Sequence, residues 1–265
     1  MKDNIRQNIT IINGLRVSYT ITSGKEPALL FLHGWTCNST FWNNQIEAFK
    51  GNHKIIAVDF RGHGESQITA EGNTVQQLAD DVYSLVCYLG LQNFVIIGHS
   101  MGGMVAQQFC VDHLECVKAL VLVTTIASDL ENKLISKKIE AETQKVGYRN
   151  AFLKYFYGWM NPDTDPKIIE WTMDEMLNVP DDVANSLVRS YRSFNLTNHL
   201  PEFQVPSLVV GAGLDTSAVP KETKTIAALL PQSKLVMIEN CGHFPMLEKP
   251  ERLNHELNKF LVSLP

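Results

Sequence analysis

The chain of 265 residues contains few cysteines, and their arrangement argues against two common architectures. Its five cysteines are an odd number, and no two of them form a C-x-x-C pair. This pattern disfavours a disulfide framework and a zinc site, and it is typical of a reducing compartment. Cys37 and Cys241 stand close to glycine-containing motifs, and we expect both to be buried, unreactive thiols.

The chain also lacks an excess of basic charge, a long apolar run and an N-terminal apolar core. Acidic residues outnumber basic ones by 28 to 23, a formal net charge of −5 at pH 7, which argues against nucleic acid as the main partner. No run approaches the roughly 18 apolar residues of a membrane span, and residues 1–17 do not resemble a secretory signal. We therefore expect a cytoplasmic globular protein, monomeric or homodimeric, that binds no membrane.

Short apolar runs recur along the chain and alternate with helical patterns. Such near-continuous runs are typical of parallel strands that are covered on both faces. The alternation predicts an α/β fold with a doubly wound, mostly parallel sheet. The predicted strands are 28–33, 54–60, 93–98, 117–123, 206–212 and 234–239, and the predicted helices are 74–89, 101–113, 220–230 and 250–262.

Two regions depart from this alternation. Residues 15–21 alternate between apolar and polar after an Asn13-Gly14 turn, which predicts an antiparallel edge strand. From about 127 to 201 no strand pattern is found, and the segment is instead rich in aromatic residues at helical spacing. We therefore predict one α/β core formed by 1–126 and 202–265, with 127–201 inserted as a helical lid.

The stretch Gly-His-Ser-Met-Gly at 98–102 lies between a predicted strand and a predicted helix. At such a turn a G-x-S-x-G sequence holds the serine in a strained backbone conformation and exposes its Oγ, and the flanking glycines avoid clashes. Ser100 is therefore the candidate nucleophile. The alternative is a tight turn that merely requires small residues.

A serine nucleophile needs a base, and the base needs an acid to orient it. In open α/β sheets these groups gather at the carboxyl ends of the strands. Asp215 directly follows the predicted strand 206–212, and His243 directly follows 234–239. The sequence therefore predicts a Ser100, Asp215 and His243 triad in that chain order.

Acyl transfer also needs hydrogen-bond donors for the oxyanion that forms in the transition state. One predicted donor is the backbone N–H of Met101, which follows the nucleophile at a helix N-terminus. The second is the backbone N–H of Trp35, in the loop after strand 28–33. This chemistry requires no cofactor and no metal.

Three other histidines stand near the motifs. His33 and His99 belong to the motif backbone, and His63 lies in a glycine-containing turn. We expect all three to make structural hydrogen bonds, which leaves His243 as the base.

Two other aspartates lie at or beyond the ends of predicted strands. Asp59 precedes the serine in the chain, and we expect it to be a structural partner of Arg61. Asp129 is the one rival of Asp215 for the role of the acid, and it already lies in the predicted lid.

Five stretches match one family in order and spacing. They are FLHGW (31–35), VDFRGHGES (58–66), GHSMGG (98–103), GLD (213–215) and GHFPMLEKPE (242–251). Together they resemble the α/β-hydrolase superfamily in its compact, lid-bearing branch, and the resemblance covers essentially the whole chain. It implies the same nucleophile, acid, base and oxyanion donors. Relatives that cleave halides or epoxides place Asp at the nucleophile position, so Ser100 favours acyl transfer.

The expected function is hydrolysis of a carboxylic ester with a small or medium-chain acyl group, through an acyl-enzyme. The resemblance leaves alternatives: a pimeloyl-carrier-protein methyl ester esterase, a lactonase, or a non-hydrolytic dioxygenase, lyase or ligand receptor on the same scaffold. Lid segment 133–154 carries six basic and two acidic residues. Such charges suit an acidic carrier protein, and a solvated helix face explains them equally well. The expected partner is a small ester, free or carrier-linked.

Overall fold

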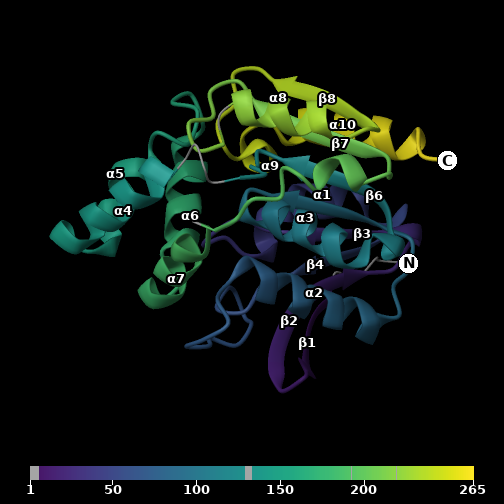
Figure 1. Ribbon diagram of the computed structural model, residues 1–265, viewed down its shortest axis with the longest axis horizontal. Helices are drawn as coiled ribbons and strands as arrows, with labels where there is room; N and C mark the ends of the chain where they lie inside the picture. The colour runs from purple at the N-terminus through teal and green to yellow at the C-terminus, as the bar shows by residue number, and fades with distance from the viewer. Residues whose placement is uncertain (1–5, 129–132, 192, 219) are drawn as a thin grey trace.

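One eight-stranded sheet runs through the molecule in the computed structural model, which describes residues 6–128, 133–191, 193–218 and 220–265 (Figure 1). The strand order is β1-β2-β4-β3-β5-β6-β7-β8, and every pairing from β4 to β8 is parallel. The fold is therefore the predicted doubly wound, mostly parallel sheet. The strands are β1 (Arg6–Ile12), β2 (Leu15–Thr22), β3 (Lys25–Leu32), β4 (His53–Val58), β5 (Phe94–His99), β6 (Val117–Val123), β7 (Ser207–Ala212) and β8 (Ser233–Ile238).

The predicted edge strand is not at the edge. β2 pairs with β1 on one side and with β4 on the other, both antiparallel, so β1 is the edge of the sheet. The turn between β1 and β2 is built as expected, because Asn13 and Gly14 both have positive φ, 52° and 81°. The segment before this turn mixes polar residues with two exposed isoleucines, Ile9 and Ile11. This mixture is not a clear strand pattern, so the pairing of the segment with β2 was not predicted.

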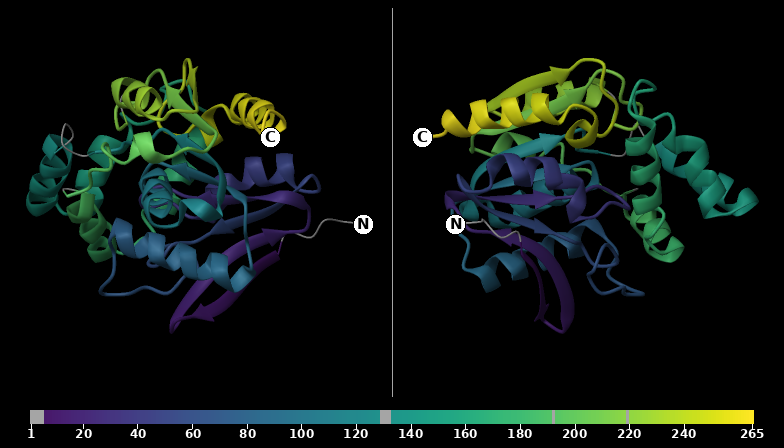
Figure 2. Two further views of the ribbon diagram at one scale, coloured as in Figure 1. Left: turned by 45° about the vertical axis from the view of Figure 1, so that its right-hand side comes forward. Right: turned by 180° about the vertical axis from the view of Figure 1, so that it is seen from behind.

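Helices cover both faces of the sheet (Figures 1 and 2). Helices α2, α3 and α8 lie on one face, and α1 and α10 lie on the other, as right-handed crossovers in opposite directions require. The core helices are α1 (Asn43–Phe49), α2 (Val75–Leu89), α3 (Met101–His113), α8 (Pro220–Leu229), α9 (Pro245–Glu248) and α10 (Pro250–Val262).

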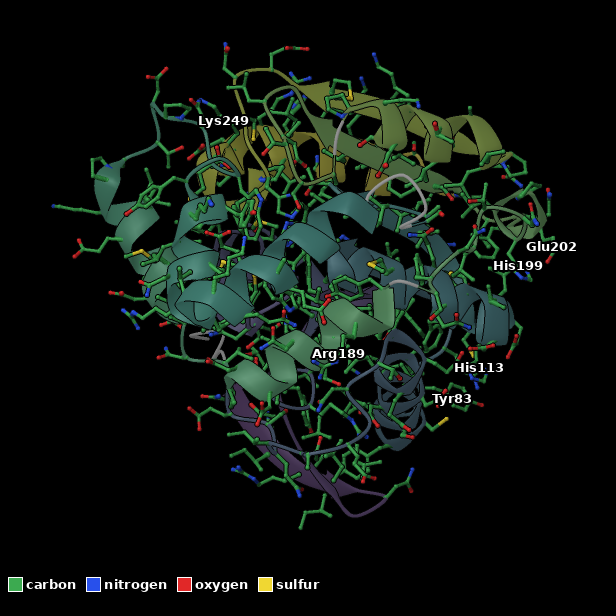
Figure 3. The ribbon with its side chains drawn as sticks, turned by 60° about the vertical axis from the view of Figure 1, so that its left-hand side comes forward. Tyr83, His113, Arg189, His199, Glu202 and Lys249 are labelled. Atoms are coloured by element: carbon green, nitrogen blue, oxygen red, sulfur yellow. The ribbon has the colours of Figure 1, made fainter. Side chains whose placement is uncertain are left out.

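Helix α2 shows how local sequence sets the ends of an element. The Thr74 hydroxyl accepts a hydrogen bond from Gln77 N at 3.2 Å, and Gly90 ends the helix in the left-handed conformation. The helix packs on α3, where Tyr83 stacks on His113 with ring centroids 3.5 Å apart (Figure 3). Contacts of α3 with β5 and β6 hold this helix against the sheet, and its N-cap is the candidate nucleophile Ser100.

Between β6 and β7 the chain forms four helices that extend beyond the carboxyl ends of the strands (Figures 1 and 2). Three of them overlap the predicted helical patterns, and the fourth, α4, falls in the basic segment. We call residues 127–201 the insert. Its helices are α4 (Lys133–Val146), α5 (Tyr148–Phe156), α6 (Pro166–Met176) and α7 (Asp181–Tyr191). In the described parts of the chain, no helix combines the length and apolarity needed to cross a membrane.

Candidate active site

Ser100 occupies a sharp turn between β5 and α3. Its φ of 51° and ψ of −118° lie outside the regions that L-residues normally adopt, a conformation that costs on the order of 1–3 kcal/mol. Glycines permit the turn: a Cβ on Gly98 would lie 2.3 Å from Gly102 O, and a Cβ on Gly102 would lie 2.3 Å from Leu32 O. The strained serine and its two obligatory glycines are what the G-x-S-x-G motif predicts.

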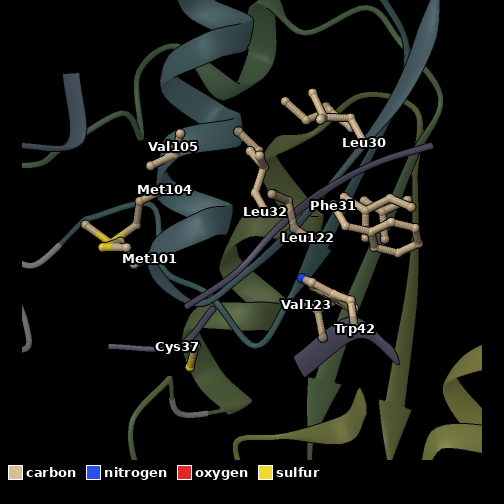
Figure 4. Close-up of a cluster of buried hydrophobic side chains, with 14 of the residues drawn as sticks. Leu30, Phe31, Leu32, Cys37, Trp42, Met101, Met104, Val105, Leu122 and Val123 are labelled. Atoms are coloured by element: carbon tan, nitrogen blue, oxygen red, sulfur yellow. The ribbon is translucent and has the colours of Figure 1, made fainter. Parts of the chain in front are cut away.

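Neighbouring strands hold this turn rigidly. Ser100 N donates a hydrogen bond to Val123 O at 3.0 Å, and Thr125 Oγ1 donates to Ser100 O at 2.6 Å. At the start of α3, Met101 and Met104 belong to the same buried apolar cluster as Leu32 of β3 and Leu122 of β6 (Figure 4). The Ser100 backbone is therefore anchored before any ligand binds.

Asp215 and His243 form a close, buried pair. His243 Nδ1 lies 2.9 Å from Asp215 Oδ2, and the two side chains are 5% and 0% exposed. The other carboxylate oxygen, Oδ1, accepts hydrogen bonds from Ser217 N at 2.7 Å and Ala218 N at 3.1 Å. The acid is thus held with one oxygen toward the imidazole, and the Nδ1–H bond leaves His243 Nε2 as the acceptor nitrogen.

The loop after β3 carries Trp35, whose backbone N–H is the second predicted oxyanion donor. The Trp35 indole Nε1 donates to Ala184 O of α7 at 3.0 Å, which ties the loop to the insert. Among the described residues, the backbone N–H groups of Trp35 and Met101 have no hydrogen-bond acceptor. The loop and the turn lie at adjacent strand ends, because β3 and β5 are neighbours and Leu32 pairs with Gly98.

A cavity of about 110 Å³ lies between these strand ends and the insert. Ser100, His243, Trp35 and Met101 all line it, so the structure brings four of the five predicted residues to one space, with Asp215 directly behind His243. Most of the remaining lining is apolar. The insert contributes Trp159, Met176, Val188 and Tyr191.

Two of these residues, Trp159 and Tyr191, are aromatic. The insert holds nine aromatic residues, and their helical spacing alone does not indicate which of them line the cavity. Phe152 and Phe156 do not line the cavity and stack on each other, with ring centroids 5.4 Å apart.

The other three histidines make structural hydrogen bonds, as predicted. His33 Nδ1 donates to Gly34 O at 2.8 Å, and His63 Nδ1 donates to Arg61 O at 2.9 Å. His99 Nε2 donates to the carbonyl oxygen of His243 at 2.9 Å. These bonds hold the loops of the site.

The expected pairing of Asp59 with Arg61 is wrong. Arg61 forms a two-pronged ion pair with Asp81 on α2, with Nε and Nη2 at 2.6 and 2.7 Å from the carboxylate oxygens. Asp59 instead accepts hydrogen bonds from the backbone N–H of Ser39 at 2.8 Å and of Glu65 at 3.2 Å. The sequence did not show that α2 passes beside the Arg61 loop. Asp129, the rival acid, lies outside the described residues.

One carboxylate at the site was not predicted. Glu248 accepts hydrogen bonds from the backbone N–H groups of Gly242 at 2.9 Å and Phe244 at 3.0 Å, on both sides of His243. The sequence contained a signal for this residue, because Glu248 belongs to the same GHFPMLEKPE stretch as His243.

The thiols nearest the site are buried, as expected. Burial raises the pKa of both Cys37 and Cys241, which keeps them as neutral thiols. Across the described residues, no group of three or more His, Cys, Asp or Glu side chains is arranged to hold a metal ion.

The buried histidines predict a loss of stability in mild acid. Burial lowers the pKa of His63 from 6.5 to about 4 and holds the pKa values of His33 and His99 well below 6.5. The unfolded chain therefore binds protons below pH 6.5 that the folded chain does not bind. Above pH 6.5 these histidines do not lower the free energy of unfolding. Below pH 6.5 each of them lowers it by up to about 1.4 kcal/mol per pH unit.

For His63 this loss continues down to about pH 4. We expect His63→Gln to reduce the slope of unfolding free energy against pH by about one proton between roughly pH 6 and pH 5. Chemical denaturation at several pH values measures this slope. An unchanged slope in the variant would contradict a neutral, buried His63.

Taken together, a doubly wound sheet, a strained serine after β5 and a histidine–carboxylate pair after later strands define a hydrolase of the α/β class. The chain belongs to the Alpha/beta hydrolase family, whose family model matches residues 29–256.

Relatives agree with this class. A bifunctional esterase/perhydrolase of Acinetobacter calcoaceticus is 26% identical over 96% of this chain and 99% of its own length. A soluble epoxide hydrolase of Corynebacterium sp. (strain C12) is 26% identical over the full length of both chains. Among solved structures, Est816, an N-acyl homoserine lactone degrading enzyme, superposes with a TM-score of 0.88 at 26% identity, over 96% of this chain and 100% of its own. These relatives support hydrolytic activity in general.

Proposed function

We propose that this chain is a serine hydrolase that cleaves carboxylic esters of small or medium-chain acids. The observation that carries the proposal is the buried His243–Asp215 pair, which faces the same cavity as the strained Ser100. A carboxylate bound to Nδ1 selects the imidazole tautomer whose Nε2 accepts a proton.

In the proposed reaction, His243 Nε2 takes the proton of Ser100 Oγ as that oxygen attacks the ester carbonyl carbon. The carbonyl oxygen becomes an oxyanion and accepts hydrogen bonds from the Trp35 and Met101 N–H groups. The C–O bond to the alcohol then breaks, and His243 returns the proton to the leaving alkoxide. Water repeats the cycle on the acyl-enzyme and releases the acid.

Ester cleavage fits this site better than epoxide opening, although an epoxide hydrolase is among the relatives. A serine oxygen with a general base and two convergent N–H groups suits a carbonyl, which develops an oxyanion. The proposed partner is therefore a small-molecule ester. Within the basic segment, Lys154 already pairs with Glu142 at 2.8 Å, which favours a solvated helix face over a carrier-binding one.

The cavity predicts a preference for short acyl chains. Drug-sized ligands fill pockets of about 300–1,000 Å³, whereas this cavity measures about 110 Å³. We expect kcat/KM to be highest for the shorter members of a p-nitrophenyl ester series from acetate to decanoate and to fall towards decanoate. The initial rate of p-nitrophenol release measures it.

Two outcomes would contradict the proposal. Absence of turnover for every ester, together with ligand-induced thermal stabilisation, would indicate a binding protein. Turnover of lactones alone, tested with an N-acyl homoserine lactone because of the similarity to Est816, would keep the serine chemistry and replace the substrate class.

A further inference from the structure

We propose that Glu248 is a positioning residue that joins the loop of His243 to the insert, so that the insert helps to set the orientation of the imidazole. This inference rests on the proposed function, because it assigns a role to the surroundings of His243 as the base. It concerns a carboxylate that does not line the cavity and does not contact Asp215.

Glu248 gathers backbone N–H groups from two parts of the chain. Its Oε1 accepts from Phe244 N at 3.0 Å, and its Oε2 accepts from Gly242 N and from Asn161 N, both at 2.9 Å. The Thr164 hydroxyl lies 3.3 Å from the same Oε2. Two of the donors flank His243, and the other two belong to the insert. Charge-assisted bonds of this kind are stronger and more directional than neutral ones.

The insert segment Gly158–Asn161, which we call the strap, makes further bonds to the same loops. Trp159 O accepts a hydrogen bond from His243 N at 2.6 Å, and Gly158 O accepts one from Thr216 Oγ1 at 2.6 Å. Asn161 Nδ2 donates to Asn240 O at 2.8 Å. The strap therefore contacts the loop that carries the acid and the loop that carries the base.

The close approach of the strap depends on Gly242. A Cβ at this position would lie 2.4 Å from Trp159 O and 2.7 Å from Asn161 N. Since both of these are backbone atoms, they have little freedom to move aside, and Gly242 is the residue type that fits.

His243 is held from three sides. Its side chain bonds to Asp215, and its carbonyl oxygen accepts from His99 Nε2 at 2.9 Å and Thr124 Oγ1 at 3.0 Å. Both of these are core contacts. Its N–H is held by the strap, and Glu248 is the group that bonds the strap to the loop on either side of it. Loss of Glu248 therefore loosens the attachment of the strap to the loop of His243 and, with it, a support of the imidazole that comes from the insert.

The first test is Glu248→Gln, which keeps the size of the side chain but places an NH₂ group against backbone N–H donors. We expect kcat for the best p-nitrophenyl ester to fall by about 10–100-fold, the range expected when a reacting group is displaced by up to about 1 Å. KM should change much less, because Glu248 does not line the cavity. The rate at which a fluorophosphonate labels Ser100 should fall in parallel with kcat, while the final extent of labelling gives the active fraction.

Two carboxylates nearby serve as matched controls. Glu256 is buried and pairs with Arg252 at 2.8 Å on α10, and Glu251 is exposed in the first turn of the same helix. Glu256→Gln removes a buried charge that does not contact the His243 loop, so it measures the general effect of such a loss. Glu251→Gln measures the effect of the change in net charge alone. We expect both to keep kcat per labelled site within about twofold of wild type.

Glu248→Asp covers the case in which Glu248→Gln does not fold. It keeps the charge but withdraws the oxygens by one methylene, so we expect a kcat between those of wild type and Glu248→Gln. The inference is overturned if kcat per labelled site in both Glu248 variants equals that of Glu256→Gln. If instead wild-type protein shows no turnover and no labelling at Ser100, the proposed function has failed and not the positioning role alone.

Discussion

Replacing Ser100 with alanine should lower kcat for p-nitrophenyl esters by about 10⁴–10⁶-fold, to the residual rate that binding and the oxyanion donors provide. The reason is chemical, because alanine has no oxygen to form the acyl-enzyme. The fold should be preserved, since the Ser100 side chain makes no capping hydrogen bond to α3 and alanine lacks only the hydroxyl oxygen of serine. Steady-state rates at saturating ester measure the effect.

The control for this substitution is Ser84→Ala. Ser84 lies on α2 and does not line the cavity, and its hydroxyl donates to Asp80 O at 2.9 Å. We expect this variant to keep the wild-type rate. A fluorophosphonate should label wild-type protein and Ser84→Ala but not Ser100→Ala, and labelling should also be lost in His243→Ala. Wild-type rates in Ser100→Ala would remove the serine mechanism altogether.

Gly102→Ala should strongly destabilise the fold. A Cβ at this position would lie 2.3 Å from Leu32 O and 2.5 Å from His33 O, both backbone atoms of the neighbouring strand end. Relief of this clash requires α3 to move away from β3, which separates the Met101 N–H from the Trp35 loop. We expect a loss of about 3 kcal/mol or more in unfolding free energy and a fall in Tm of about 6–12 °C.

A substitution at a second glycine, Gly90, is the control that distinguishes this clash from ordinary backbone strain. Gly90 has a φ of +62°, and a Cβ there would meet nothing within 4 Å. Gly90→Ala should therefore cost only about 1 kcal/mol, the usual cost of a left-handed alanine. Thermal denaturation of both variants measures the difference. Equal losses would mean that the turn at Ser100 tolerates an extra carbon atom.

Sheet and helices were largely predictable because their signals are local. A buried parallel strand needs a continuous apolar run, and a helix needs apolar residues at its own period, so both can be seen in a short window. The edge strand β1 was the exception. Its exposed Ile9 and Ile11 lie at the margin of the sheet, and only its pairing with β2 identifies it.

The candidate site residues were also predictable, because their positions follow from the topology of the fold. In a parallel sheet the residues directly after the strands gather at one edge, and Ser100, Asp215 and His243 each follow a strand. The role of each residue remains a proposal, but its place at the cavity required only the order of strands and turns.

By itself, the sequence determined the sheet, the order of its main elements and the residues that meet at the strand ends, since these depend on local patterns and chain order. Tertiary structure alone decided which partner each side chain takes: Arg61 with Asp81, and Glu248 with the flanks of His243 and the strap. It also decided that Trp159 and Tyr191, of the nine aromatic residues in the insert, line the cavity. These contacts join segments far apart in the chain, and packing between elements fixes such distances whereas residue spacing does not.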